Sequence, residues 1–197
     1  MSIDFQSSKT KENLMRAFAG ESQARNRYTF AAEQAGTAKM PVLKEIFTFT
    51  ANQEQAHAKV FYDHLSQLAG QTIGIDGTYP IDIADNLLDL LHMAEHNELE
   101  EFESVYPAFA KAAQEEGYPK VAASFQMIAR IEQSHAKRFQ HIARLMEQNQ
   151  LFAAPQDEVW MCLNCGYVVE STMAPASCPV CHHPQGYFVR MEMVPFH

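Results

Sequence analysis

Apolar residues recur every three or four positions along the first 150 residues, which is the spacing of one face of an α-helix. The pattern predicts four helices: from Ser8 or Thr10 to about Gln34, from Pro41 to about Leu68, from Ile83 to Glu116, and from Pro119 to Gln148. Residues 69–82 are rich in glycine and long for a tight hairpin, so they are expected to cross the bundle. Residues 1–150 are therefore predicted to form a four-helix bundle.

After Leu151 the pattern changes to short, aromatic runs that are typical of β-strands. Residues 151–157 are expected to be a linker, and residues 158–197 a small β-rich domain. About forty residues cannot bury a stable core unaided, which predicts a stabilising metal. The expected fold class is mainly α: a four-helix bundle followed by a small β-rich metal domain.

Two Glu-x-x-His units interrupt the apolar stripes of the second and fourth helices. They are Glu54 with His57 and Glu132 with His135, in the similar settings EQAHAKVF and EQSHAKRF. Two residues three apart on a helix point the same way. Carboxylate-rich bundles bind two iron or manganese ions with two such units and a single Glu from each remaining helix.

The other two helices must supply the single carboxylates. On the first helix Glu21 lies on the apolar face, where a carboxylate without a partner is costly, and the alternative is an exposed Glu21. On the third helix Glu98 is in phase with the apolar stripe, Glu101 lies one turn further on, and Glu95 is also near the stripe. These residues are the candidate ligands of the first and third helices.

Tyr28 and Tyr106 occupy apolar faces and are expected in the core. Their phenols would lie close to the carboxylates and could hydrogen-bond a ligand or a reacting oxygen. The histidines at positions 64, 92, 96 and 141 are expected to be ordinary surface or packing residues.

Four cysteines form two C-x-x-C pairs near the C-terminus: Cys162, Cys165, Cys178 and Cys181. In a reducing compartment this pattern indicates a metal site rather than disulfides. Four thiolates suit zinc or a single iron, and their spacing leaves both open. His182 and His183 follow the second pair, but the four cysteines already complete a tetrahedral site.

The net charge of −9, without a basic run, argues against nucleic acid and anionic membranes as partners. No apolar run approaches the roughly 18 residues of a membrane span, and the start lacks the apolar core of a signal peptide. A cytoplasmic location is expected. Without a Gly-rich dinucleotide fingerprint, the chain is not expected to bind NAD(P)H in a Rossmann fold.

Taken together, the motifs resemble the rubrerythrin family over nearly the whole chain. They are GESQARNRY at 20–28, EQAH at 54–57, VYPAF at 105–109, EEGYP at 115–119, EQSH at 132–135, and CxxCGY with CPxC within 162–181. The resemblance implies a ferritin-like bundle with a non-haem di-iron site, followed by a rubredoxin-like domain with one iron on four cysteines.

The metal ligands in the bundle that the resemblance implies are Glu21, Glu54, His57, Glu98, Glu101, Glu132 and His135. Glu21 and His57 would serve one iron, Glu98 and His135 the other, with bridging carboxylates from positions 54 and 132. One iron would exchange between Glu101 and His57 as its redox state changes. The family's Glu-x-x-Glu at a fixed distance before Tyr-Pro selects Glu101 over Glu95 as the partner of Glu98.

The resemblance also implies a peroxidase that reduces hydrogen peroxide to water and protects against oxidative stress. Electrons would come from an NAD(P)H-dependent reductase or a rubredoxin through the Cys-ligated iron. A homodimer is expected, head-to-tail or domain-swapped. The alternatives are a ferroxidase or iron-storage protein, and a non-enzymatic zinc-ribbon module.

Overall fold

The computed structural model describes residues 3–194, so residues 1–2 and 195–197, at the outer ends of the two predicted domains, lie outside the described part. Five α-helices, α1 (Lys9–Thr37), α2 (Pro41–His64), α3 (Leu87–Glu100), α4 (Tyr106–Glu115) and α5 (Pro119–Glu147), are described, with a π-helix at Glu101–Val105. The strands are β1 (Ala153–Cys162), β2 (Val168–Met173) and β3 (Phe188–Arg190). Short 3₁₀ helices lie at Phe5–Ser7, Ser66–Leu68, Gln185–Tyr187 and Met191–Met193.

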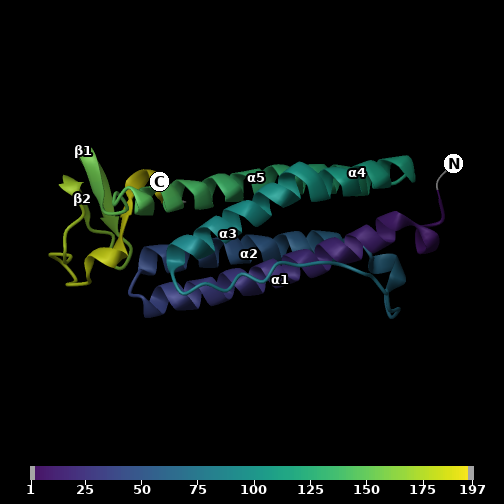
Figure 1. The fold of residues 1–197 in the computed structure, drawn as a ribbon, viewed down its shortest axis with the longest axis horizontal. Coiled ribbons are helices and arrows are strands. Elements are labelled where there is room, and N and C mark those ends of the chain that lie inside the picture. The colour runs from purple at the N-terminus through teal and green to yellow at the C-terminus, as the bar shows by residue number, and fades with distance from the viewer. Residues whose placement is uncertain (1–2, 195–197) are drawn as a thin grey trace.

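The long helices form two hairpins that pack side by side (Figure 1). One hairpin is α1 with α2, and the other is α3 and α4 with α5. The predicted bundle is confirmed. Ser8 caps α1 by accepting a hydrogen bond from the N–H of Lys11, at 3.1 Å. Pro41 and Pro119 open α2 and α5, where a missing N–H is harmless.

The helix ends differ from the prediction where turn geometry competes with the apolar pattern. Helix α1 continues beyond Gln34 to Thr37, whereas α2 ends at His64 and its predicted last turn, to Leu68, is a 3₁₀ helix. The third segment differs more. It begins at Leu87 rather than Ile83, because Asn86 is the N-cap and accepts from the N–H of Asp89 at 2.9 Å.

The prediction of one continuous α-helix over residues 83–116 is wrong. The π-helix at Glu101–Val105 separates α3 from α4, and this segment lies beside the polar centre of the bundle. A π-helix accommodates an additional residue without ending the helix, so the apolar faces on both sides still point into the bundle.

The segment between α2 and α3 crosses the bundle, as predicted, and runs along α1 (Figure 1). Asp76 pairs with Arg16 at 2.6 Å, and Asp82 pairs with Arg27 further along α1. The amide of Gln34 donates to the carbonyl of Ala84 at 3.1 Å. This one crossing segment therefore takes the chain from the first hairpin to the second and is held along α1 by side-chain contacts.

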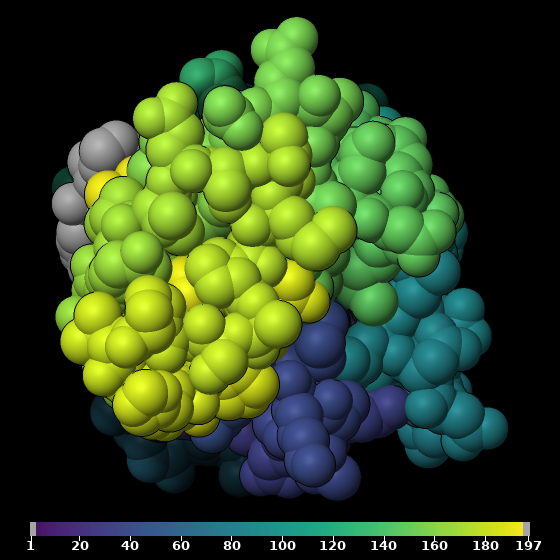
Figure 2. Space-filling model, turned by 90° about the vertical axis from the view of Figure 1, so that its left-hand side faces the viewer, coloured from purple at the N-terminus to yellow at the C-terminus, as the bar shows by residue number. Residues whose placement is uncertain are grey.

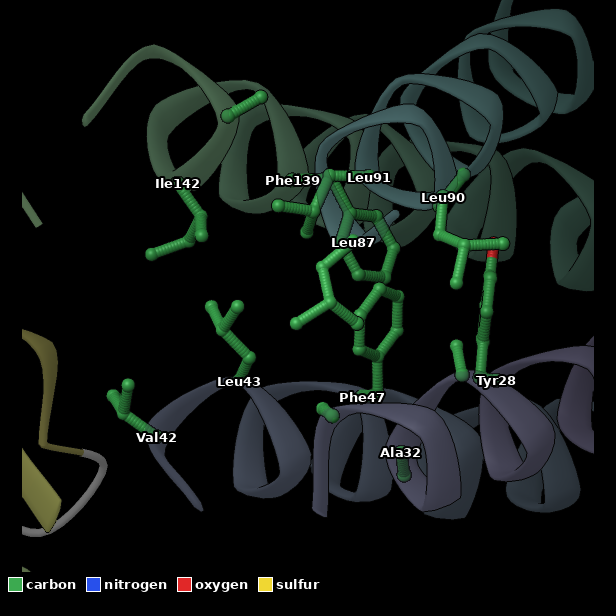
Figure 3. Packing of buried hydrophobic residues seen from close by; sticks show 14 of the residues in the cluster. Tyr28, Ala32, Val42, Leu43, Phe47, Leu87, Leu90, Leu91, Phe139 and Ile142 are labelled. Atoms are coloured by element: carbon green, nitrogen blue, oxygen red, sulfur yellow. The ribbon is translucent and has the colours of Figure 1, made fainter. Parts of the chain in front are cut away.

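The bundle has two apolar clusters rather than one. The cluster nearer the β-strands includes Leu43, Phe47, Leu91 and Phe139, and Figure 3 shows their side chains interdigitating between the helices. The distant cluster is built around residues such as Phe125. Between the two clusters every helical rod contributes acidic or imidazole side chains that are fully or nearly fully buried. A polar layer therefore divides the core.

The three strands form an antiparallel sheet in the order β2-β1-β3. Trp160 and Phe188 are fully buried in a small third cluster, beside two of the cysteines. A linker was expected over residues 151–157, but its later part belongs to the sheet, because β1 begins at Ala153 and pairs there with Met173. Helix α5 ends at Glu147, so only a short segment connects the bundle to the sheet.

The sheet and cysteine loops pack against the end of the bundle at the turn between α1 and α2 (Figure 2). Gly186 lies so close to this turn that an added Cβ would meet the carbonyl oxygen of Lys39 at 2.5 Å. Val189 belongs to the nearer apolar cluster of the bundle. Arg190 donates to the carbonyls of Gln150 and Ala153, at 2.9 and 2.8 Å. None of the described helices combines the length and apolar character that crossing a membrane requires.

Candidate metal centres

The polar layer contains two overlapping groups of metal-ligating side chains. The first group is Glu21, Glu54, His57 and Glu132, and the second is Glu54, Glu98, Glu132 and His135. Within each group one ligand atom from every residue lies within 4.8 Å of the others, and all the residues are buried. Glu54 and Glu132 belong to both groups. The structure thus brings together six of the seven predicted bundle residues, with the two predicted bridging carboxylates shared.

In the described part of the chain, several buried oxygens of this layer meet no hydrogen-bond donor other than the Nδ1 of an imidazole. They are Glu21 Oε2, Glu54 Oε1, Glu98 Oε2, Glu132 Oε1 and Glu132 Oε2. A buried carboxylate oxygen without a donor is strongly unfavourable unless a cation neutralises it. Carboxylate and imidazole groups together suit iron. The residues present therefore fit a pair of iron ions.

Because several carboxylates are buried close together, their pKa values are shifted from the usual ones. Burial, followed by the charges of Glu132 and Glu54, raises the pKa of Glu21 well above its usual value. Burial and the charge of Glu54 raise the pKa of Glu98 to about 8. Burial alone would raise the pKa of Glu54, but hydrogen bonds from the two imidazoles outweigh it and lower that pKa to about 2. Without cations the layer must hold protons.

Both imidazoles direct Nδ1 into the layer. His57 Nδ1 lies 2.9 Å from Glu132 Oε1 and 3.2 Å from Glu54 Oε2. His135 Nδ1 lies 2.9 Å from both Glu54 Oε1 and Glu132 Oε2. Burial disfavours an imidazolium, but the neighbouring carboxylates outweigh burial and raise the pKa of His57 to about 9 and of His135 to about 12. Bound cations would replace these protons.

Each outer carboxylate is held by a tyrosine of the opposite hairpin. The phenol of Tyr28 donates to Glu98 Oε1, and the phenol of Tyr106 donates to Glu21 Oε1. Both tyrosines are almost completely buried, as expected. Each carboxylate therefore has one oxygen occupied by a phenol and leaves the other, the one without a donor, facing the layer.

Glu101 lies in the π-helix and belongs to neither group. It lines a cavity of about 570 Å³ together with Arg27, Tyr79 and Tyr106. Its pKa is raised well above the usual value by burial, followed by the charges of Glu98 and Glu132, so it borders the layer. Glu95 instead accepts from Gln140 on the outer face, at 2.7 Å, away from both groups.

Sequence reasoning missed the residues around His135. Its Nε2 lies 3.1 Å from Gln53 Oε1, which also accepts from Arg138 Nη1 at 3.2 Å. The signal was present in the two similar octapeptides, since Arg138 stands where the first copy has Val60. The four other bundle histidines lie outside both metal groups, in keeping with their expected ordinary roles.

The four cysteine sulfurs form a second candidate centre. They lie within 4.8 Å of one another, with 3.7 Å between the sulfurs of Cys162 and Cys181 and 3.6 Å between those of Cys165 and Cys178. A tetrahedral site with metal–sulfur bonds of about 2.3 Å has edges of about 3.8 Å. These cysteines are free of disulfides. His182 and His183 are not part of this group.

The backbone shapes this centre into two matching loops. The N–H of Gly166 donates to the carbonyl of Cys162, and the N–H of His182 donates to the carbonyl of Cys178, at 2.8 and 2.9 Å. Gly166 and His182 both have positive φ, at 75° and 60°. Each loop thereby turns sharply after its second cysteine and presents two sulfurs on one side.

A helical bundle with two Glu-x-x-His units around a buried carboxylate layer, joined to a four-cysteine domain, defines a ferritin-like di-iron protein with a rubredoxin-like iron site. The family described as "Rubrerythrin" matches residues 12–143, and the one described as "Rubrerythrin, rubredoxin-like domain" matches residues 160–189. This chain belongs to the rubrerythrin family. Its iron sites are the carboxylate and imidazole layer of the bundle and the four cysteines.

Similar proteins cover nearly the full length. A rubrerythrin of Clostridium perfringens is 42% identical over 181 residues, which are 91% of this chain and 93% of that protein. A rubrerythrin of Porphyromonas gingivalis is 41% identical over 98% of this chain and 94% of its own. A solved structure of mixed-valence nigerythrin has a TM-score of 0.62 at 26% identity, over 96% of this chain and 91% of its own.

Proposed function

We propose that this protein is a peroxidase that reduces hydrogen peroxide to water at the di-iron layer of its bundle. Electrons are delivered by a partner, an NAD(P)H-dependent reductase or a rubredoxin, through the iron on the four cysteines. The observation that carries the proposal is the combination of two overlapping Glu/His groups with an electron-transfer domain in one chain. A site that only stored iron would not need that domain.

We assign Glu21 and His57 to one iron, Glu98 and His135 to the other, and Glu54 and Glu132 to both. The shared membership of Glu54 and Glu132 in the two groups supports the bridging assignment. When bound, a di-ferrous pair supplies the two electrons that convert one hydrogen peroxide and two protons into two water molecules. Tyr28 and Tyr106 orient the outer carboxylates, because each phenol donates its hydroxyl proton to Oε1 of Glu98 or Glu21 and leaves Oε2 for the metal.

Glu101 is proposed as the carboxylate that exchanges with His57. It is only half-buried, unlike the six grouped residues, and it lines the 570 Å³ cavity. Burial of its carboxyl group and the charges of Glu98 and Glu132 raise its pKa, which favours the uncharged form when it is not a ligand. Glu101→Gln is therefore expected to bind two iron ions but to turn over peroxide more slowly.

The test is an anaerobic stopped-flow experiment on the fully reduced full-length protein. Mixed with a small excess of hydrogen peroxide over the three electrons that the reduced chain holds, both the di-iron and the cysteine-bound iron should be oxidised, and much faster than by oxygen. Faster oxidation by oxygen, together with accumulation of mineral iron, would instead identify a ferroxidase. The visible spectrum of the purified protein must show iron–thiolate absorption, because a colourless protein with zinc on the cysteines could not relay electrons.

We also propose a cytoplasmic homodimer, either head-to-tail or domain-swapped, in which one subunit's cysteine domain serves its partner's bundle. Membership of the rubrerythrin family is what motivates this proposal. Light scattering after size-exclusion chromatography measures the mass directly. A monomer, or a large cage, would contradict the proposed assembly.

A further inference from the structure

The two metal-facing imidazoles differ in what lies behind them. His135 Nε2 faces Gln53 Oε1 at 3.1 Å, on the side opposite the carboxylates. Among the described residues none hydrogen-bonds Nε2 of His57, and the carboxylates that pair with this imidazole do so at Nδ1. The two halves of the layer therefore have similar ligands but differ in the residues directly behind the two imidazoles.

Arg138 determines which atom of the Gln53 side chain faces His135. Its Nη1 lies 3.2 Å from Gln53 Oε1 and 2.9 Å from Thr50 Oγ1, and a guanidinium can only donate. The Gln53 atom between Arg138 and His135 must therefore be the carbonyl oxygen. This contact removes the usual ambiguity between the oxygen and nitrogen of an amide.

An oxygen acceptor at this position fixes the tautomer of His135. Because Gln53 Oε1 can only accept, the proton of a neutral His135 lies on Nε2 and the lone pair lies on Nδ1. Nδ1 is the atom that lies 2.9 Å from Glu54 and Glu132. The imidazole is thus held in the orientation and the tautomer that a metal ligand requires.

The other half of the bundle lacks both members of this contact. The two Glu-x-x-His units are 78 residues apart, and the same offset places Ile131 opposite Gln53 and Val60 opposite Arg138. Both are apolar and partly exposed, at 37% and 39%. Neither can accept from an imidazole N–H.

We propose that Gln53 and Arg138 are positioning residues that lock His135 onto its iron through a directed hydrogen bond, while His57 carries no such lock. The inference rests on the ligand assignment above. It deepens that assignment by explaining, from residues outside the ligands, which imidazole is fixed and which is free to leave. Arg138 acts through Gln53, and Gln53 acts through His135.

The test uses the full-length protein with ¹⁵N-labelled histidine and the bundle loaded with Co(II). A metal-bound imidazole gives a hyperfine-shifted N–H signal in the proton NMR spectrum, and its exchange with water is measurable. The wild-type protein should show one slowly exchanging signal, from His135, and one rapidly exchanging signal, from His57. Two unshifted histidines would refute the ligand assignment itself, independently of the lock.

Gln53→Leu removes the acceptor and should accelerate exchange of the slow signal at least tenfold. It should also weaken binding of one Co(II) by about 10- to 100-fold, the usual effect of removing a partner behind a ligand. Gln53→Glu keeps the acceptor and should restore slow exchange. Gln55→Leu makes the same change at an exposed position of α2 and should leave the signal unchanged.

Arg138→Val places at this position the residue of the other half and tests the lock without changing the amide. This variant should increase the exchange rate of the His135 N–H, because Arg138 no longer holds the Gln53 side chain with its oxygen toward His135. Unchanged exchange in both Gln53→Leu and Arg138→Val, in protein that retains two Co(II) ions, overturns the proposal. Equal effects of Gln53→Leu and Gln53→Glu also overturn it, since they would show only altered packing.

Discussion

Tyr28 and Tyr106 help to connect the two hairpins at the iron layer. Each phenol donates to an outer carboxylate of the other hairpin, from α1 to Glu98 and from α4 to Glu21. These bonds cross the bundle in the polar layer between the two apolar clusters. They therefore contribute both to the position of the ligands and to the association of the hairpins.

Removing one of these phenols is expected to weaken iron binding more than it weakens the fold. Tyr106→Phe retains the ring packing but frees Glu21 to rotate, so we expect about 10-fold weaker binding of one Fe(II). Anaerobic Fe(II) titration of the metal-free protein measures this. Tyr62→Phe, at an exposed tyrosine of α2, is the control and should bind normally. Normal iron affinity in Tyr106→Phe would show that the phenol does not orient the carboxylate.

Gly166 is required for its backbone conformation rather than for space. Its φ is +75°, and an added Cβ would meet no atom within 4 Å. Gly166→Ala should therefore destabilise the cysteine loop by about 1 to 2 kcal/mol through the left-handed conformation alone. Gly166→Asn, which tolerates this conformation, should be less destabilising. Thermal denaturation of the iron-loaded protein compares the two variants. Equal losses would point to a steric cause instead.

At the scale of the elements, the start of α1 is held by a residue from the far end of α4. Glu116 accepts from the N–H groups of Lys9 and Thr10, at 2.9 and 2.8 Å, and from the hydroxyl of Thr10 at 2.6 Å. A carboxylate at a helix N-terminus satisfies free N–H groups and favours the helix dipole. Burial would raise the pKa of Glu116, but these hydrogen bonds outweigh it and lower that pKa.

Glu116→Gln should destabilise the metal-free protein by about 1 to 3 kcal/mol at neutral pH. Because the folded pKa lies below the ordinary value of 4.5, the wild-type advantage is fully present above that pH and is lost as the pH falls through the folded pKa. Urea denaturation at several pH values measures this difference. Glu115→Gln, at the exposed neighbour, is the control. A difference that persists at low pH would contradict the charged hydrogen bonds.

The π-helix is the element that sequence reasoning could not supply. Glu21 precedes Tyr28 by seven residues, whereas Glu98 precedes Tyr106 by eight, yet both tyrosines reach the opposite carboxylate. The extra residue is accommodated at Glu101–Val105. Periodicity extends an α-helix through such a segment, because one wider turn barely changes the apolar stripe.

The bundle was predictable because burial imposes a period, and the clustering of its carboxylates because a buried carboxylate demands a partner. The crossing segment followed from its length, and the division of the ligands between two irons from the resemblance to the rubrerythrin family. Strand β1 was predicted only from Val159, because the residues before it carry no apolar alternation. Ala153 and Glu158 pair with β2, but the register shifts between them, and a sequence pattern does not reveal such an irregularity. Gln53 and Arg138 were missed for a different reason. They are polar residues at the edge of the core. The difference between Arg138 and Val60 in the two octapeptides marks the position, but only the folded contact with His135 shows what it does.

At the scale of the whole molecule, Gly186 sets how closely the cysteine domain approaches the bundle. Its missing side chain allows contact with the Lys39 carbonyl, and a Cβ at 2.5 Å from that oxygen would force backbone to move. Gly186→Ala should therefore loosen the docking without breaking the cysteine site. Hydrogen exchange at the α1–α2 turn and at β3 should rise.

Gly74→Ala provides the control, since a Cβ there meets no atom within 4 Å. Iron–thiolate absorption should be normal in both variants. Unchanged exchange in Gly186→Ala would show that the backbone accommodates the Cβ and that this contact does not fix the domain.

The polar layer that divides the core also makes the two apolar clusters contribute separately to the free energy of unfolding. Phe47 and Phe125 are both fully buried, but they belong to different apolar clusters on either side of that layer. Substitutions without shared neighbours usually add in their effects on unfolding free energy, to within about 0.5 kcal/mol. Phe47→Leu and Phe125→Leu should therefore be additive in a double-mutant cycle on the metal-free protein, whereas Phe47→Leu and its direct neighbour Phe139→Leu should not. Either half of the bundle can then change its packing independently, provided that the ligands between the halves stay in place.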